Sequence, residues 1–319
     1  MSHVLTRLLA TAPDLTPVAS LPAWRARLDE ATSDMAAPAD RALVAGFVAD
    51  RVAYAFAGGY EAALARLTRG RLDTARARRP TSLCITEEGG GHPRAVKTRV
   101  TERPDGRLSI TGRKQWATGA PLADVLLVAA STGTDAAGRN RLSILAVDAH
   151  APGVTLKKMP DPPFAPELPH AHVELDGVVV TRDDVLPGDG YDEYVKPFRT
   201  IEDIHVFLAL VGHVLRGARS YGPRELVEQA AASALALREL AEMDASAPET
   251  HVALAGALEL GRSLLERADE AWRNAPDDVR ARWERDRALS MVAERARAER
   301  RARAWERLGP STRDDRAIS

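Results

Sequence analysis

The sequence predicts an α+β multidomain protein with N-terminal helices, a middle antiparallel β-barrel and a C-terminal four-helix bundle. Two observations support this prediction. Apolar residues recur at helical spacing at both ends of the 319-residue chain. Between them, short runs rich in β-branched residues alternate with turn signals. We therefore expect a short N-terminal helical domain over residues 1–79, the barrel over 80–195 and the bundle over 196–319.

The N-terminal part contains two helix start signals. Ser20 is a favoured N-cap residue, and Pro38 is suited to a first helical turn. The apolar residues that follow Pro38 at helical spacing predict a buried stripe: Leu43, Val44, Phe47, Val48, Val52 and Phe56. We expect the Gly58-Gly59 pair to end that helix.

The middle part alternates short apolar runs with turns. Strands are predicted over residues 96–100, 108–111, 125–129, 142–147, 154–157, 172–175 and 178–181. Turn signals separate these runs, among them Pro104-Asp105-Gly106 and Asp176-Gly177. Short strands at this regular spacing predict a small barrel or sandwich.

The C-terminal part becomes helical again after Pro197. Helices are predicted over residues 201–218, 224–243, 249–272 and 277–308. Pro223, Pro248 and Pro276 each stand at a helix start, where the missing N–H would have had no intrahelical acceptor. Short connections between these helices predict an antiparallel bundle.

Composition excludes several classes of function. The formal net charge of −1 does not point to nucleic acid or to a membrane surface. The only cysteine, Cys84, excludes an intramolecular disulfide and fits a reducing compartment. The N-terminus is a poor signal peptide, and no apolar stretch reaches the length of about eighteen residues needed for a span. We expect a cytoplasmic protein.

Two further patterns suggest sites but are weak. His170 and His172 would share one face of a strand, yet two imidazoles without a nearby Cys or third His do not make a zinc site. The arginines of residues 280–307 alternate with acidic residues, which is typical of a solvated, ion-paired helix face. We therefore expect no metal and no nucleic-acid partner.

Two short segments together indicate a flavin site. They are residues 86–92 (TEEGGGH) and residues 112–118 (GRKQWAT). A glycine-rich turn lets backbone N–H groups approach a phosphate. The indole of Trp116 can stack on a flat heterocycle, and the hydroxyls of Thr86 and Thr118 can bond its edge. Ordinary strand threonines, a flexible turn and a core indole are the alternative interpretation, which the residues alone leave open.

The succession of helices, strands and helices resembles the acyl-CoA dehydrogenase family. Four stretches of the middle part carry the same resemblance. Residues 83–91 are similar to its apolar-apolar-Thr-Glu-Pro-Gly-x-Gly segment, and residues 112–118 to its Gly-x-Lys-x-Trp-Ile-Thr. Residues 122–129 match the Ala-Asp and strand that come next, and residues 173–188 resemble the segment closing the barrel. The resemblance implies an acyl-CoA dehydrogenase-like fold, FAD as cofactor and an acyl-CoA substrate.

The resemblance also implies roles for the residues of the two segments. Thr86 would bond the pyrimidine edge of the flavin, Trp116 would pack against the isoalloxazine, and Thr118 would bond near its N5 edge.

The end of the glycine turn, with Gly89, Gly91 and His92, would contact the FAD pyrophosphate. His92 stands where the family usually has Ser, and an imidazole can either donate to phosphate or fill the space.

The implied reaction needs a carboxylate that removes the α proton of the acyl-CoA while a hydride leaves the β carbon for flavin N5. Most family members carry this Glu after a late glycine-rich stretch, which has no counterpart here. A minority place it in the first bundle helix, ten residues before a Gly. Glu202, ten residues before Gly212, is therefore the candidate base. Asp203 replaces the usual Arg, and an acidic first helical turn is the alternative interpretation.

Three functions stay open. The first is an FAD-dependent acyl-CoA dehydrogenase-type oxidoreductase. The second is a non-catalytic relative that binds flavin, acyl-CoA or a partner subunit, and the third is a flavin-dependent oxygenase on the same scaffold. The resemblance implies a homodimer or homotetramer, while the acyl chain and the electron acceptor are not determined by the sequence.

Overall fold

The computed structural model describes residues 2–291 and 293–309. The chain forms two compact units. Residues 1–63 and 200–319 make up a helical unit, and residues 64–199 make up a sheet unit. Segments from both ends of the sequence therefore share one unit. The three-domain division in sequence order remains a proposal.

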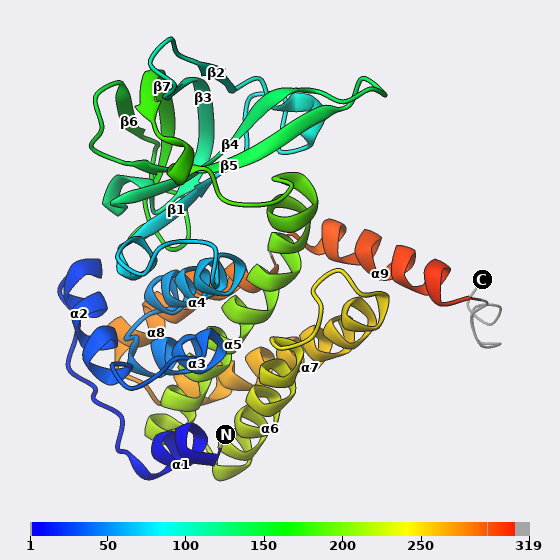
Figure 1. The fold of residues 1–319 in the computed structure, drawn as a ribbon. Helices are drawn as coiled ribbons and strands as arrows, with labels where there is room; N and C mark the ends of the chain where they lie inside the picture. Colours follow the sequence, from blue (N-terminus) through cyan, green and yellow to red (C-terminus); the bar gives the residue numbers. More distant parts are fainter. Residues whose placement is uncertain (1, 292, 310–319) are drawn as a thin grey trace. The chain divides into compact units, whose positions relative to one another are not determined.

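The helices begin close to the predicted start signals (Figure 1). The side chain of Ser20 accepts a hydrogen bond from the N–H of Ala23 at 3.3 Å, and Pro38 is the first residue of its helix. None of the helices that the structure describes is long and apolar enough to cross a membrane. In chain order they are α1 (Ser2–Ala10), α2 (Leu21–Ala31), α3 (Pro38–Val48), α4 (Val52–Leu67), α5 (Lys196–Tyr221), α6 (Arg224–Leu240), α7 (Pro248–Trp272), α8 (Asp277–Asp286) and α9 (Glu294–Leu308).

The Gly58-Gly59 pair does not end a helix, which corrects the expectation from the sequence. Helix α4 runs through both residues. A Cβ on Gly58 would collide with the side chain of Ala45, and a Cβ on Gly59 would lie 2.6 Å from the Cα of Val206. These glycines therefore serve close packing between helices rather than helix termination.

Helices α3 and α5 also pack backbone against backbone. A Cβ on Gly212 would collide with the carbonyl oxygen of Leu43, and a Cβ on Gly46 would collide with that of Ala209. Gly212 is the residue that sets the register of the candidate base Glu202 in the sequence. In the structure its lack of a side chain is required by the helix crossing.

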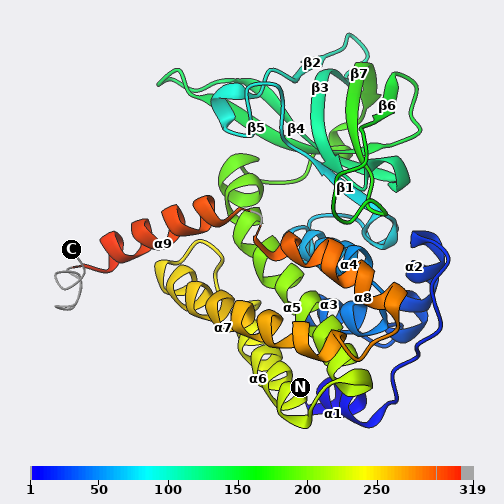
Figure 2. The same cartoon turned by 180° about the vertical axis from the view of Figure 1, so that it is seen from behind.

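The last predicted helix, residues 277–308, is two helices instead of one. A 3₁₀ segment, η6 (Arg287–Met291), follows α8. Ala293 then has a left-handed φ of +74° at the start of α9, so the helical path cannot continue straight. Figure 2 shows α9 running in a different direction from α8. No Gly or Pro marks this break in the sequence.

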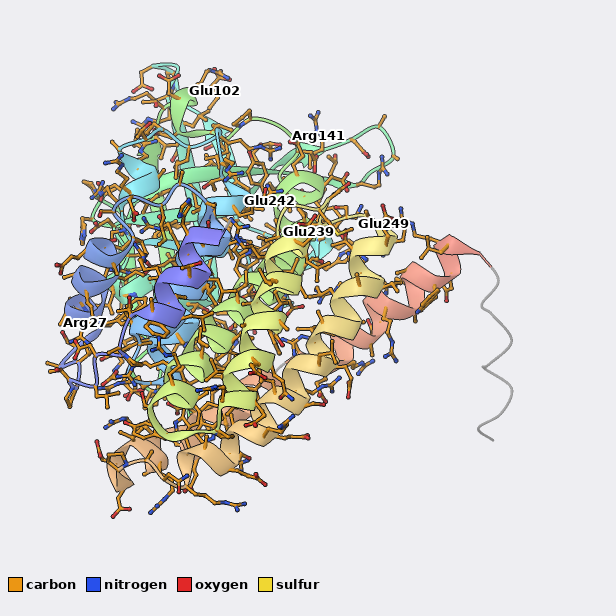
Figure 3. The ribbon with its side chains drawn as sticks, turned by 90° about the horizontal axis from the view of Figure 1, so that it is seen from below. Arg27, Glu102, Arg141, Glu239, Glu242 and Glu249 are labelled. Carbon is orange, nitrogen blue, oxygen red and sulfur yellow. The ribbon has the colours of Figure 1, made fainter. Side chains whose placement is uncertain are left out.

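Exposed acidic side chains lie in and on both sides of the connection between α6 and α7. Figure 3 shows Glu239 and Glu242 near the end of α6 and Glu249 at the start of α7. All three are exposed, which is the usual position of acidic side chains.

A buried aromatic cluster stabilises the interior of the helical unit. The rings of Trp272 and Trp283 stack with centroids 4.4 Å apart, and the imidazole of His213 lies 5.6 Å and 6.0 Å from them. His213 Nδ1 lies 3.1 Å from the carbonyl oxygen of Ala49, to which it donates in the neutral state. Burial, with a smaller contribution from the charge of Arg216, lowers the pKa of His213 to about 4.

Seven strands form one sheet in the sheet unit. The strand path is β1-β4-β2-β3-β7-β6, with β5 paired to β4, and β4 and β5 make a long hairpin (Figure 1). Strands β1 and β4 are parallel, in register from Thr81 opposite Val125 to Cys84 opposite Val128. The strands are β1 (Thr81–Cys84), β2 (Arg99–Glu102), β3 (Leu108–Thr118), β4 (Val125–Thr134), β5 (Asn140–Asp148), β6 (Val154–Lys158) and β7 (His170–Val180).

The predicted antiparallel barrel is therefore wrong in two respects: the sheet is open, and it includes parallel pairs. The free edge of β5 is covered by an irregular segment, not by β6. The N–H of Leu186 donates to the carbonyl of Ile144, and that of Gly190 to the carbonyl of Leu142, each at 2.8 Å. This segment satisfies the edge without closing the sheet.

The Asp176-Gly177 signal marks a bulge and not a turn. Residues 172–175 and 178–181 were predicted as two strands, but β7 is continuous from His170 to Val180. Gly177 has a φ of +61°, and the pairing of β7 with β3 shifts register at this point. A glycine with positive φ suits a bulge as well as a turn, so the local sequence cannot distinguish them.

We expect Gly212→Ala to destabilise the protein by about 1–3 kcal/mol, because the new methyl group would force α3 and α5 apart. Gly256→Ala in α7 is the matched control, since a Cβ there meets nothing within 4 Å. The control should be neutral or more stable by about 0.5–1 kcal/mol. Urea unfolding of both variants measures the difference, and equal stabilities would contradict the packing argument.

We expect stability to fall as the pH drops from 7.5 to 5.5, with about 1 kcal/mol of the loss due to His213. The unfolded chain binds a proton near pH 6.5, whereas the folded imidazole resists protonation until about pH 4. The stabilisation is therefore present above pH 6.5 and is lost as the pH falls. Urea unfolding across this range should show a shallower dependence for His213→Gln, and an unchanged dependence would refute the assignment.

Candidate functional site

The two predicted flavin-binding segments lie next to each other in the sheet unit. The backbone N–H of Gln115 in β3 donates to the carbonyl oxygen of Thr86 at 2.8 Å. The side-chain amide of Gln115 donates to the carbonyl oxygen of Glu87 at 2.9 Å. Thr86 is therefore held beside the residue that precedes Trp116.

A buried ion pair joins the same two segments. Lys114 Nζ lies 2.7 Å from Glu87 Oε1, and the Lys114 side chain is fully buried. Burial alone would raise the pKa of Glu87, but Lys114 and hydrogen bonds from Lys97 and Thr98 overcome it and lower that pKa. Burial lowers the pKa of Lys114, and Glu87 offsets part of that effect. Sequence reasoning assigned neither residue a role, although both stand in the matched motifs.

The glycine turn is a closed structure. Glu87 and Gly90 exchange two backbone hydrogen bonds, of 3.1 Å and 2.8 Å. Gly90 has a φ of +104°, which only glycine adopts without strain. Gly89 is exposed, and a Cβ on Gly91 would lie 3.6 Å from Thr86 Oγ1. The turn thus places bare backbone beside the Thr86 hydroxyl.

His92 follows the turn and is exposed. Its Nδ1 accepts a hydrogen bond from the N–H of Arg94 at 3.2 Å and caps a short 3₁₀ segment, η2 (Pro93–Ala95). In the neutral imidazole the proton then resides on Nε2. Nε2 is accordingly the nitrogen of His92 that can donate to a phosphate.

Trp116 is a strained, exposed residue. Its φ is +58°, and the pairing of β3 with β7 shifts register between Lys114 and Ala117. The indole is 59% exposed, so the alternative interpretation as a core residue is wrong. Left-handed backbone in a bulky residue costs about 1–2 kcal/mol, and such strain clusters at ligand-binding sites.

His170 is a neighbour of Trp116 that sequence reasoning weighed only as a metal ligand. It stands opposite Thr118 in the register of β7 on β3, and its ring centroid lies 6.4 Å from that of Trp116 in an edge-to-face arrangement. Burial lowers the pKa of His170, which favours a neutral imidazole. This neighbour of Trp116 could be identified only from the pairing of β3 with β7, which the sequence does not give.

The candidate base Glu202 lies in the helical unit, on α5. Helix α5 begins at Lys196, directly after a π-helical turn, η5 (Tyr191–Val195). Glu202 is therefore beyond the first turn, so the alternative interpretation as a helix N-terminal acid is wrong. Its side chain is half-buried.

Asp203 binds arginines from a distant part of the sequence. Its carboxylate accepts from Arg297 at 3.0 Å and 2.8 Å and also from Arg300. The guanidinium of Arg297 lies 5.2 Å from the ring centroid of Phe207. Helix α9 is thereby attached to α5 beside Glu202. The cationic partners of Asp203 therefore come from α9.

No group of three or more His, Cys, Asp or Glu side chains within residues 2–291 and 293–309 is arranged to hold a metal ion.

The chain resembles known proteins in its sequence and in its fold. Residues 82–178 match the family described as acyl-CoA dehydrogenase, middle domain. This part of the chain is similar to an acyl-CoA dehydrogenase middle domain. The match includes the glycine turn, the Trp116 bulge and His170, but it ends before Glu202.

A curated relative supports the same family. Benzylmalonyl-CoA dehydrogenase of Aromatoleum aromaticum is 30% identical over 132 residues, which are 40% of this chain and 34% of that protein. The alignment thus spans about one third of the relative's length. These matches confirm the resemblance to the acyl-CoA dehydrogenase family.

Solved structures extend the likeness beyond the middle domain. Butyryl-CoA dehydrogenase from Megasphaera elsdenii has a TM-score of 0.71 at 16% identity, covering 96% of this chain and 99% of that one. FMN-bound TdsC from Paenibacillus sp. A11-2 has a TM-score of 0.66 at 19% identity, covering 96% and 95%. At these identities the likeness shows the fold, which is that of acyl-CoA dehydrogenases.

We expect Trp116→Gly to be more stable than Trp116→Ala by about 0.5–1 kcal/mol, because glycine relieves the left-handed strain of the middle-domain bulge. Both variants lose the indole. The difference between their free energies of unfolding, measured in urea, therefore reports the backbone strain at position 116. At Gln115, which has no positive φ, the order should reverse. If alanine were more stable than glycine at position 116 as well, Trp116 would be unstrained.

Proposed function

We propose that this protein is an FAD-dependent oxidoreductase of the acyl-CoA dehydrogenase type, acting on an acyl-CoA thioester. The observation that carries the proposal is the exposed, strained indole of Trp116, joined through Gln115 and Lys114 to a bare glycine turn. An apolar ring costs free energy when it is left in water, and here a strained backbone holds it there. A flat cofactor stacked on the indole would remove the ring from water and so recover the cost of its exposure.

The residues of the middle domain fit a flavin. Trp116 would pack on the isoalloxazine, while the hydroxyls of Thr86 and Thr118 would bond its polar edges. The backbone at Gly89 and Gly91 lets a pyrophosphate approach closely, and His92 Nε2 would donate to it. Bound flavin would supply the hydride acceptor that no side chain can provide.

Glu202 is proposed as the base that takes the α proton of the acyl-CoA. Glu202 is half-buried on α5, and a carboxylate is a side chain that can act as a general base. The neighbouring Asp203 forms ion pairs with Arg297 and Arg300 and is not proposed as the base. A homodimer or homotetramer and an external electron acceptor are parts of the same proposal.

A non-catalytic relative that binds flavin, acyl-CoA or a partner subunit is the second candidate. It is favoured by the lack of a late glycine-rich stretch in residues 277–308, which instead form α8, η6 and α9. A flavin-dependent oxygenase is the third candidate and shares the same cofactor site.

The absorbance spectrum of the purified protein tests the proposal. We expect flavin bands between roughly 370 and 450 nm, present as isolated or after addition of FAD or FMN. Butyryl-CoA under nitrogen should bleach them. Glu202→Gln should keep the colour and slow bleaching by at least about 100-fold, the usual effect of losing a general base. Glu228→Gln, an exposed position on α6, should bleach normally.

The outcomes separate the three functions. A protein that stays colourless with both flavins excludes the dehydrogenase. Colour without bleaching by acyl-CoA supports the non-catalytic relative, and colour that needs an external reductant and then consumes oxygen supports the oxygenase. Full bleaching of Glu202→Gln would remove Glu202 from the mechanism.

A further inference from the structure

The Lys114–Glu87 contact has features that general stabilisation does not require. The two charges lie 2.7 Å apart, with side-chain exposures of 0% and 7%. Lys114 also donates to the carbonyl oxygen of Ile85 at 3.3 Å. A buried ion pair is often no more stabilising than a well-packed apolar pair of the same volume. We therefore ask how this ion pair constrains the chain segments that it connects.

Glu87 connects three pieces of chain through one carboxylate. Oε1 accepts from Lys114 and from the N–H of Thr98 at 3.0 Å, and Oε2 accepts from the N–H of Lys97 at 2.8 Å. The backbone of Glu87 also closes the glycine turn through Gly90. One side chain thus fixes the turn against β3 and against the segment that leads into β2. An apolar side chain could not satisfy these backbone donors.

Lys114 constrains the other segment, residues 112–118, which contains the Trp116 bulge. It is the last residue paired with β7 before the bulge, opposite Val173, and pairing resumes at Ala117 opposite Ala171. Trp116 lies between these two fixed points with its φ of +58°. A strained conformation persists only where its surroundings over-determine it. The buried ammonium group provides that constraint on one side of the bulge.

We propose that Lys114 and Glu87 are positioning residues of the flavin site, which hold the glycine turn and the Trp116 bulge in one preformed arrangement. The inference rests on the proposed function, because it assigns the pair a role in presenting cofactor-binding groups. Neither residue needs to touch the cofactor. Preorganisation of this kind lowers the ordering cost that binding would otherwise have to meet.

The test compares Lys114→Met with Lys157→Met. Lys157 makes an ion pair of the same type with Glu174, at 2.9 Å between β6 and β7, but both side chains are partly exposed. We expect Lys114→Met to bind FAD at least tenfold more weakly, as measured by titration of the apoprotein. Lys157→Met should bind within twofold of wild type, because exposed pairs contribute little.

General destabilisation is controlled by Gly212→Ala, whose defect lies in the helical unit. If lost stability were the cause, this variant would weaken FAD binding in the same proportion. Flavin fluorescence at saturating protein gives a second readout. Stacking on the indole quenches it in wild type and in Gly212→Ala, whereas Lys114→Met should leave bound FAD brighter because Trp116 is no longer held in place.

A double variant, Glu87→Gln with Lys114→Met, covers the case in which the single variant does not fold. It leaves no unpaired buried charge and keeps one acceptor oxygen, so folding should recover, while FAD binding should stay at least several-fold weaker than wild type. Amide hydrogen exchange of the apoprotein should be faster at residues 86–92 and 115–117 and unchanged at 125–134.

The two proposals fail in different ways. If wild type binds neither FAD nor FMN, the proposed function fails, and hydrogen exchange alone decides whether the pair orders the two segments. If wild type binds FAD and the double variant binds it equally, with unchanged quenching and exchange, the positioning role is refuted.

Discussion

The ionic contact between Lys114 and Glu87 is the constraint on which the candidate site depends. In the low-dielectric interior each charge needs the other, because an unpaired buried charge is costly. The carboxylate also satisfies the N–H groups of Lys97 and Thr98. Removing either charge would therefore disturb several chain segments at once. The exposed indole and the closed glycine turn are both consequences of this buried polar network.

The helical unit obeys a different constraint, the close approach of helix backbones. Gly46 and Gly212 bring α3 and α5 into contact, and Gly59 does the same for α4. Nearer the start of α5, Asp203 attaches α9 through Arg297 and Arg300. Asp203 thus has a structural role, because it holds α9 against α5.

Local pattern predicted most elements but not how they end. Helices α2 and α3 start at Ser20 and Pro38 because capping and proline geometry act within a few residues. The Gly58-Gly59 and Asp176-Gly177 signals were misinterpreted for a common reason. Glycine permits a turn, a bulge or a close packing contact, and only the neighbouring chain decides which of these forms. The break before α9 had no signal in the sequence at all.

The sequence by itself determined the succession of helices and strands, the family resemblance and the presence of Thr86, Trp116 and Thr118, because periodicity and motifs are local properties. Tertiary structure alone decided that Trp116 is exposed on a strained bulge and that the sheet stays open at β5. It also decided that His170 faces the indole and that Lys114 pairs with Glu87. Exposure, pairing and the partner of a buried charge depend on residues far apart in the chain, which no short stretch of sequence specifies.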